Sequence, residues 1–225
     1  VLEEAAKRLE KSKNPKETTV ELIKEFYSEH KRVVFNGNGY SQEWLDEAKD
    51  RGLSNIESTV DALQQLIEPF NVKMMEKHNV FSLEELQGRL EVYLGIYSKQ
   101  INIEAGVMVE MARRSIVPSV TRYLSELCVD IKSQKDLNFK TDELDKIASL
   151  LSRQLNETIK TTEDLHIYLA QALVIDSSAL DQALFYQNEI IPRMELLRSH
   201  VDILEIYTDK EAWPFPSYEE LLFRL

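Results

Sequence analysis

The feature that most constrains this chain is a repeat of apolar residues at intervals of three and four, running from Ser82 to about Lys135. Ser82 with Glu85 three residues later is a capping box, so a helix is expected to begin at Leu83. At about 1.5 Å per residue, roughly fifty residues make a rod about 75 Å long, which needs other long helices beside it to bury its apolar face. The apolar positions with this spacing are Leu86, Leu90, Tyr93, Leu94, Tyr97, Ile101, Met108, Met111, Ala112, Ile116, Val120, Tyr123, Leu124, Leu127 and Ile131.

Composition supports a helical protein with a real core. The chain has 225 residues, of which 43% are hydrophobic, and only six Gly and six Pro, which favours long helices over many-stranded sheets. Lys plus Arg number 27 against 39 Asp plus Glu, and a net charge of −12 repels phosphate backbones and anionic lipids. Neither nucleic acid nor a membrane surface is therefore expected as a partner. Without a long apolar run or a signal pattern, the expected compartment is the cytoplasm.

A single cysteine, Cys128, falls on the apolar repeat of the long helix. A lone thiol at such a position is expected to pack as a small apolar group rather than to react. With one cysteine the chain can form no internal disulfide.

The N-terminal part begins with an amphipathic pattern over residues 1–13 that has no cap and is ended by Asn14-Pro15. A start in the middle of a helix predicts that the chain is a piece of a longer one. Thr18 followed by Glu21 has the pattern of a second capping box, which predicts that the next helix opens at Thr18.

Two Asn-Gly dipeptides, Asn36-Gly37 and Asn38-Gly39, follow a short β-branched and aromatic run. Each pair can adopt the positive φ of a tight turn at low cost, so a defined loop is expected here. Such loops can also bind phosphate through backbone amides, but this one lacks the glycine spacing and the Lys-Ser/Thr of a P-loop. We interpret it as structural.

Two further caps follow the loop. Ser41 is expected to cap a helix over residues 42–51 that ends at Gly52, a position suited to a left-handed residue. Ser58 is expected to begin a short helix that is broken at Pro69.

Glu104 departs from the apolar pattern of the long helix, because it falls on the same predicted face as Ile101 and Met108. A carboxylate buried between helices must find a partner, since an isolated buried charge costs several kcal/mol. We expect a bond to a neighbouring helix rather than a catalytic role. Gly106 would allow another backbone to approach closely.

Two more long helices are predicted after a polar loop over residues 133–140. The first runs to about Ile175 with a possible interruption at Thr161-Thr162, and Asp176-Ser177-Ser178 ends it and caps the second. Short loops make such helices antiparallel neighbours.

Two prolines lie inside predicted long helices. Because proline lacks an N–H and crowds the carbonyl four residues earlier, Pro118 should kink the first helix near Arg114, and Pro192 should kink the third. After the third helix, an extended apolar strap containing Trp213 is expected before a last short helix capped by Ser217 and Glu220.

Glu163-x-x-His166 is the one spacing typical of a metal site, because di-iron bundles place such a pair on one helical face. Those sites need two such motifs, and His30, His78 and His200 have no Glu three residues earlier. The sequence also lacks zinc spacings, a phosphate loop with Lys, and a nucleophile with an evident base. From its residues alone the chain is a helical scaffold without a self-contained active site.

Several stretches resemble one enzyme family. Residues 31–53, with Lys-Arg-Val-Val-Phe-Asn-Gly-Asn-Gly-Tyr-Ser-Gln-Glu-Trp at their start, look like the end of the catalytic domain of type III glutamine synthetases, the large bacterial form. Residues 97–118 resemble the helix that follows it, and residues 189–194 and 213–218 are similar to the family's C-terminal helices and ending. The residues that carry the resemblance are Asn36, Gly37, Asn38, Gly39, Tyr40, Trp44, Glu104, Pro118, Pro192 and Trp213.

The resemblance implies a parent enzyme that joins glutamate and ammonia with ATP and a divalent metal, Mg or Mn, in a two-ring dodecamer. In that family the metal ligands and nucleotide-binding arginines lie upstream of everything matched here. No catalytic, cofactor-binding or metal-binding residue is therefore assigned to this chain, which alone is expected to be inactive. Its expected partners are the remainder of the catalytic domain and neighbouring subunits of a homo-oligomer.

The fold class predicted is all-α: a bundle of three long, partly Pro-kinked antiparallel helices preceded by several short helices. Residues 1–80 are expected to be short helices and the Asn-Gly loop at the end of the catalytic domain, and residues 81–225 the C-terminal bundle. Two alternatives remain open. One is a free-standing helical protein-interaction module without catalysis, and the other a metal-binding bundle.

Overall fold

The structure is a computed structural model that describes residues 1–222, and the regular elements within that range are all helical. Two compact units divide the chain, residues 1–57 and residues 58–225, and each is described by itself. The all-α class is confirmed. The predicted domain boundary after residue 80 concerns the family's domains and stays a prediction.

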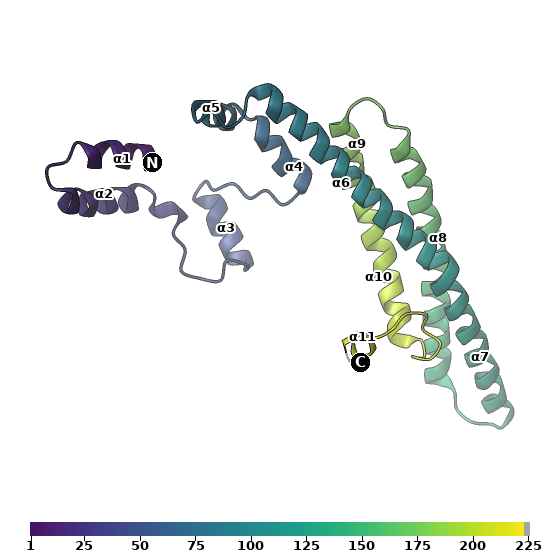
Figure 1. The fold of residues 1–225 in the computed structure, drawn as a ribbon. Coiled ribbons are helices and arrows are strands. Elements are labelled where there is room, and N and C mark those ends of the chain that lie inside the picture. The colour runs from purple at the N-terminus through teal and green to yellow at the C-terminus, as the bar shows by residue number, and fades with distance from the viewer. Residues whose placement is uncertain (223–225) are drawn as a thin grey trace. The chain divides into compact units, whose positions relative to one another are not determined.

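In the first unit, α1 (Leu2–Glu10) and α2 (Pro15–Glu29) form a short helical hairpin (Figure 1). Both nitrogens Nη1 and Nη2 of Arg8 donate to the carboxylate of Glu25, each at 2.8 Å, and tie α1 to α2. The elements of this unit are α1 (Leu2–Glu10), α2 (Pro15–Glu29), the 3₁₀ turn η1 (Lys31–Val33) and α3 (Gln42–Asp50).

The start of α2 differs from the prediction. The helix begins at Pro15, with Asn14 as the flanking residue, and the predicted start at Thr18 is wrong. Proline is favoured at the first helical position because its fixed φ suits a helix and its missing N–H would be unpaired there anyway. Pro15 therefore opens α2 a full turn before the Thr18 pattern.

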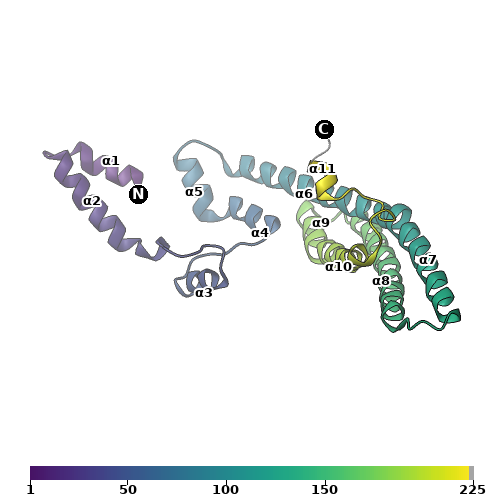
Figure 2. The same ribbon diagram turned by 90° about the horizontal axis from the view of Figure 1, so that it is seen from below.

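The second unit contains the three long helices (Figures 1 and 2). One continuous helix of α6, η3 and α7 runs from Leu83 to Asp136, α8 returns antiparallel to it, and α9, η4 and α10 form the third. The predicted arrangement of three long helices is confirmed. The elements are α4 (Thr59–Gln64), η2 (Gln65–Ile67), α5 (Pro69–Lys77), α6 (Leu83–Met111), η3 (Ala112–Ile116), α7 (Val117–Asp136), α8 (Asp142–Leu173), α9 (Ala179–Phe185), η4 (Tyr186–Ile190), α10 (Ile191–Tyr207) and α11 (Tyr218–Leu222).

A π-helical segment precedes each of the two prolines at which a kink is predicted. Pro118 is the second residue of α7 and follows η3, and Pro192 is the second residue of α10 and follows η4. Proline cannot donate to the carbonyl four residues earlier and its ring crowds that carbonyl, and a local widening to i→i+5 hydrogen bonds relieves both problems. Each long helix therefore continues through its proline with a changed register.

Three apolar clusters hold the second unit together. One lies between α6, α8 and the third helix and contains the fully buried Tyr186, and a second lies between η3, α7, α8 and α10 around Val120 and Leu151. The third joins α4 to α6 and α9 through Val60, Leu90, Leu94 and Ala183, so the short helices after residue 57 belong to this unit.

Local signals fixed several helix ends as predicted. Glu85 N–H donates to Ser82 Oγ at 3.3 Å and Ser82 N–H donates to Glu85 Oε2 at 2.8 Å, which confirms the capping box. Gly52, at φ +68°, ends α3 in the left-handed conformation, as predicted. Asn138, at φ +62°, ends α7 in the same way.

The predictions for Glu104 and Gly106 are wrong. Glu104 is exposed, and its carboxylate accepts from Gln100 Nε2 on the same helix at 2.6 Å rather than from a neighbouring helix. The next residue, Ala105, is completely buried, and Glu104 lies about 100° around the helix from it. Gly106 is also exposed, with no atom close to where a Cβ would be.

Cys128 is exposed, so its predicted burial is also wrong. The core face of α7 is centred on Val120 and Ile131, and at about 100° per residue Cys128 lies about 80° away from Val120. The thiol borders a shallow groove between α7 and α8.

The predicted interruption of α8 at Thr161-Thr162 does not occur. Both hydroxyls donate to carbonyls of the preceding turn, Thr161 Oγ1 to Glu157 O at 2.7 Å and Thr162 Oγ1 to Thr158 O at 2.6 Å. These bonds satisfy the hydroxyls without breaking the backbone ladder, so both residues are buried inside a continuous helix.

The segment after α10 turns rather than extending, which corrects the predicted strap. Trp213 N–H donates to Asp209 O at 2.9 Å, and bends follow through Phe215. Trp213 and Phe215 pack on the second apolar cluster as expected of apolar residues. Ser217 and Glu220 cap α11 reciprocally, as predicted.

Candidate functional site

The loop between η1 and α3 in the first unit is the candidate site. Its entry is held by two aromatic rings, because Phe35 stacks on Trp44 of α3 with ring centroids 4.2 Å apart. Gly37 lies against this stack, where an added Cβ would meet Cε1 of Phe35 at 2.8 Å. A side chain larger than that of glycine at residue 37 would therefore force the Phe35 ring to move.

The conformational reason predicted for the two glycines is wrong. None of Asn36, Gly37, Asn38 and Gly39 has a positive φ. The turn is instead built by side-chain bonds, since Asn38 Oδ1 accepts the N–H of Tyr40 at 3.0 Å. Asparagine makes such turns readily.

The same turn is joined to the start of α3 by Ser41. Ser41 Oγ donates to Asn38 O at 2.8 Å and accepts the N–H of Trp44 at 3.4 Å, which confirms the predicted cap. The loop and the first turn of the helix thus form one hydrogen-bonded structure.

Arg51, at the end of α3, holds the other end of the loop. Its Nη1 donates to the carbonyls of Arg32 at 3.0 Å and Val34 at 2.8 Å, and Glu47 pairs with its Nη2. The guanidinium carbon also lies 5.6 Å from the centre of the Trp44 ring, within cation–π range. The sequence placed Arg51 only at the end of the predicted helix and within the resemblance, and this role was missed, although its position four residues after Glu47 was a visible signal.

Tyr40 is the exception in this loop, because its side chain is 100% exposed. The loop therefore presents one aromatic side chain on a backbone fixed at both ends by Trp44 and Arg51. A tyrosine ring offers a large apolar area and a hydroxyl at low entropic cost, which suits docking to another protein surface.

The other predicted signature residues lie in the second unit at separate places. Glu104 is exposed on α6, Pro118 and Pro192 begin helices after π-helical segments, and Trp213 packs on the second apolar cluster. They form no common site, and each of the last three has a structural role.

A cluster around Arg193 was not identified from the sequence. Arg193 Nε donates to Asp164 Oδ2 at 2.9 Å, Nη1 donates to Glu189 Oε2 at 2.8 Å, and the guanidinium carbon lies 3.2 Å from the centre of the Tyr168 ring. This cluster ties α8 to α10. Because Arg193 donates to Asp164 of α8 and to Glu189 of η4, we assign it a structural role.

The suggested metal pair does not assemble into a ligand set. Glu163 Oε2 accepts from Arg113 Nη2 at 2.5 Å, an ion pair between α8 and η3. Among residues 1–222, no group of three or more His, Cys, Asp or Glu side chains is placed to hold a metal ion.

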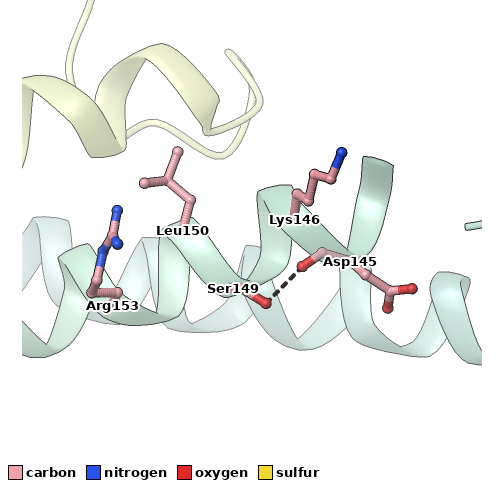
Figure 3. Close-up of a pocket in the computed structure, with 5 residues that line it drawn as sticks. All are labelled: Asp145, Lys146, Ser149, Leu150 and Arg153. Carbon is pink, nitrogen blue, oxygen red and sulfur yellow. Dashed lines mark hydrogen bonds between the residues drawn. The ribbon is translucent and has the colours of Figure 1, made fainter. Parts of the chain in front are cut away.

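The second unit has several hollows on its surface. Figure 3 shows one whose lining residues, Asp145, Lys146, Ser149, Leu150 and Arg153, all come from α8. Its one drawn hydrogen bond runs from Ser149 Oγ to the backbone oxygen of Asp145, at 2.7 Å. A hollow lined by a single helix is part of that helix's surface and has no facing groups with which to enclose a ligand.

Two tyrosines and two aspartates have shifted pKa values with structural causes. Burial raises the pKa of Tyr97 and of Tyr186, whose hydroxyl donates to Asn102 Oδ1 at 3.1 Å. Hydrogen bonds from Lys135 and Thr141 lower the pKa of Asp145, and those from Ser178 and Ser177 lower the pKa of Asp181. The aspartate bonds hold the α7–α8 loop and the start of α9.

The described part of the chain is all-helical, and its candidate site is a loop held at both ends that presents one fully exposed tyrosine. A family model described as "Glutamine synthetase C-terminal domain" matches residues 18–135, just over half of the chain. The chain therefore belongs to the glutamine synthetase C-terminal domain family.

Three curated relatives are named glutamine synthetases, in agreement with this family. The chain is 31% identical over 220 residues to a glutamine synthetase of Butyrivibrio fibrisolvens, covering 93% of this chain and 30% of that protein. It is 31% identical over 209 residues to the type-3 glutamine synthetase of Dictyostelium discoideum, covering 90% and 28%. It is 29% identical over 223 residues to a glutamine synthetase of Bacteroides fragilis (strain YCH46), covering 96% and 30%. The chain thus spans less than a third of the length of these relatives and corresponds to a C-terminal region.

Among residues 1–222, no helix is long and apolar enough to cross a membrane.

Proposed function

We propose that this chain is the C-terminal structural and assembly segment of a type III glutamine synthetase and carries no catalytic residue itself. The observation that carries the proposal is the fully exposed Tyr40 on a loop whose neighbours are all held in place. A fixed loop with one free aromatic side chain is suited to docking on another part of the enzyme, since little entropy is lost when it binds.

In this proposal the parent enzyme joins ammonia to glutamate with ATP and Mg or Mn, in the cytoplasm, as a homo-oligomer. The finding that no group of three or more His, Cys, Asp or Glu side chains among residues 1–222 is placed to hold a metal ion supports assigning the metal site to the remainder of the parent. The hollow drawn in Figure 3 is part of the surface of α8. The catalytic groups are assigned to the remainder of the parent, and no step of the reaction is assigned here.

The alternative of a free-standing interaction module has the exposed apolar residues of α6 in its favour. The interaction module and the assembly segment differ in what the gene must encode. A module would be encoded by a reading frame that starts close to Val1, whereas the assembly segment follows a catalytic domain in the same frame.

The experiment compares variants of the complete product of the reading frame that encodes this chain. Tyr40→Ala is expected to lower the assembled fraction, measured by light scattering on a size-exclusion column, and glutamine formation with it. Tyr27→Ala is the matched control, because Tyr27 is a 55% exposed tyrosine on α2 of the same unit. Wild-type assembly and activity in Tyr40→Ala would contradict the docking role.

A further inference from the structure

The side of α6 that faces away from the apolar clusters carries large apolar residues in line. Val92, Ile96, Ile103 and Val107 are 59%, 57%, 60% and 48% exposed. In Figure 2, α9 and α10 lie on one side of α6 only. The residues that form this α6 outer stripe are all exposed, and Arg114 extends it into η3, which continues the helix: Glu85, Arg89, Val92, Ile96, Lys99, Ile103, Val107, Glu110 and Arg114.

The stripe has the geometry of a helix-pairing surface. Its members recur at intervals of three and four and, at about 100° per residue, fall within a band about 80° wide. Apolar residues at these intervals are typical of coiled-coil contacts. Isolated exposed apolar residues are ordinary on a protein surface, but four aliphatic side chains in one line indicate a partner helix.

The apolar residues of the stripe are arranged symmetrically. Its midpoint falls between residues 99 and 100, and Ile96 and Ile103 are equally distant from that point. Val92 and Val107 are equally distant from it as well. When two copies of α6 lie antiparallel about a two-fold axis at the midpoint, isoleucine meets isoleucine and valine meets valine.

The charged residues follow the same symmetry with opposite signs. Arg89 and Glu110 are equally distant from the midpoint, and so are Glu85 and Arg114 farther out. In the antiparallel pair each positive side chain faces a negative one of the partner. A parallel pair in register would place Arg89 against Arg89 and Glu85 against Glu85, and like charges at such positions are destabilising.

We infer that α6 pairs antiparallel with α6 of a second copy of this chain, with Ile96 of each copy against Ile103 of the other. The inference rests on the assembly role proposed above and names one partner for it. A two-fold contact between identical patches is the commonest form of homo-oligomer interface.

The size of the contact predicts its strength. From Glu85 to Arg114 the stripe is about 44 Å long, and with a width of about 10 Å on each helix the pair buries on the order of 900 Å² in total. That area is at the low end for specific interfaces. The 225-residue chain is therefore expected to form a dimer that dissociates on dilution.

Lys99 is the one member that opposes pairing, because two copies of it meet beside the axis. Gly88, Gly95 and Gly106 line the same edge of the stripe, and no atom lies within 4 Å of where their Cβ atoms would be. Both lysines can extend over this edge into water. Lys99→Leu removes the repulsion and is expected to tighten the dimer about tenfold, the ratio that 1.4 kcal/mol produces.

The first test is sedimentation of the full 225-residue chain over a dilution series. We expect a monomer–dimer equilibrium that Ile96→Glu abolishes. The matched control is Ile159→Glu, which adds the same charge at a 48% exposed isoleucine of α8 and should leave the dimer intact. Circular dichroism melting of each variant reports whether it is folded.

The second test addresses register and charge. Arg89→Glu should weaken the dimer, and Arg89→Glu combined with Glu110→Arg should restore it. In a Cys128→Ser background, a mixture of Ile96→Cys and Ile103→Cys chains should form an intermolecular disulfide far faster than either variant alone.

A folded chain that stays monomeric, a dimer that survives Ile96→Glu, or a charge swap that restores nothing would each overturn the pairing. None of these results bears on the Tyr40 comparison, which uses the complete enzyme. Failure of the pairing and failure of the proposed function can therefore be told apart.

Discussion

The rings of Phe35 and Trp44 stack with centroids 4.2 Å apart and planes inclined by 26°, and this pair fixes the loop that presents Tyr40. The contact joins the segment before the loop to the helix after it. The orientation of the exposed Tyr40 therefore depends on a contact between two half-buried rings that Tyr40 itself does not make.

Gly37→Ala tests this dependence, because the added methyl group would collide with the Phe35 ring. We expect loss of the stack and destabilisation of the first unit by about 1–3 kcal/mol, the usual cost of overpacking. Gly39→Ala is the matched control, because open space surrounds the position of its Cβ. Trp44 fluorescence in a Trp213→Phe background reports the stack during thermal unfolding. Equal effects of the two alanines would contradict the account.

Thr158 offers a second test, in the core of the long helices. The residue is completely buried, and among the described residues its hydroxyl oxygen has no hydrogen-bond partner. Thr158→Val should raise the free energy of unfolding by about 1 kcal/mol, since it removes an unpaired polar atom. Thr162→Val removes a hydroxyl that is bonded to Thr158 O. It should be less stable than Thr158→Val by about 1 kcal/mol. Urea denaturation measures both, and the reverse order would count against the assigned bonds.

Asp145 predicts how acid affects the second unit. Hydrogen bonds from Lys135 and Thr141 hold its pKa below the ordinary 3.8, so the folded state favours the charged carboxylate. A lowered pKa adds stability that is present above the ordinary value and is lost as the pH falls through the folded-state value. Compared with Asp145→Asn, the wild-type chain should therefore melt higher at neutral pH, and the difference should begin to shrink near pH 3.8 and vanish only below the lower pKa of the folded state. Asp142→Asn in the same turn is the control, and a difference that persists in acid would contradict the assignment.

The sequence predicted those features that short-range chemistry determines. The caps at Ser41, Ser82 and Ser217 each need residues within one turn, and all three are present. The cap predicted at Thr18 failed for a local reason too, because Pro15 is a stronger start signal.

The failures at Glu104 and Cys128 have a different cause. A stripe drawn over fifty residues assumes one constant period, but the core face drifts around a straight helix and η3 adds a further change of register at Ala112–Ile116. Residues at the edge of the stripe, such as these two, are then placed on the wrong side. Only the packing of α8 and α9 against α6 and α7 decides the face.

The candidate loop was found from its residues, but its construction was not. The Asn-Gly pairs indicated a turn, whereas the bonds from Arg51 to Arg32 and Val34 join segments well separated in sequence. The spacing of apolar residues along the sequence does not indicate such a contact. The identity of the parent family rests on resemblance and on the matched family model rather than on any physical pattern.

Glutamine formation from glutamate, ammonia and ATP, measured for the 225-residue chain and for the complete product of its reading frame, tests the central claim most directly. The account predicts no product from the chain alone and ATP- and Mg-dependent product from the complete protein, with metal-binding carboxylates encoded upstream of Val1. Glutamine formed by the isolated chain, or a reading frame that begins within a few codons of Val1, would contradict it.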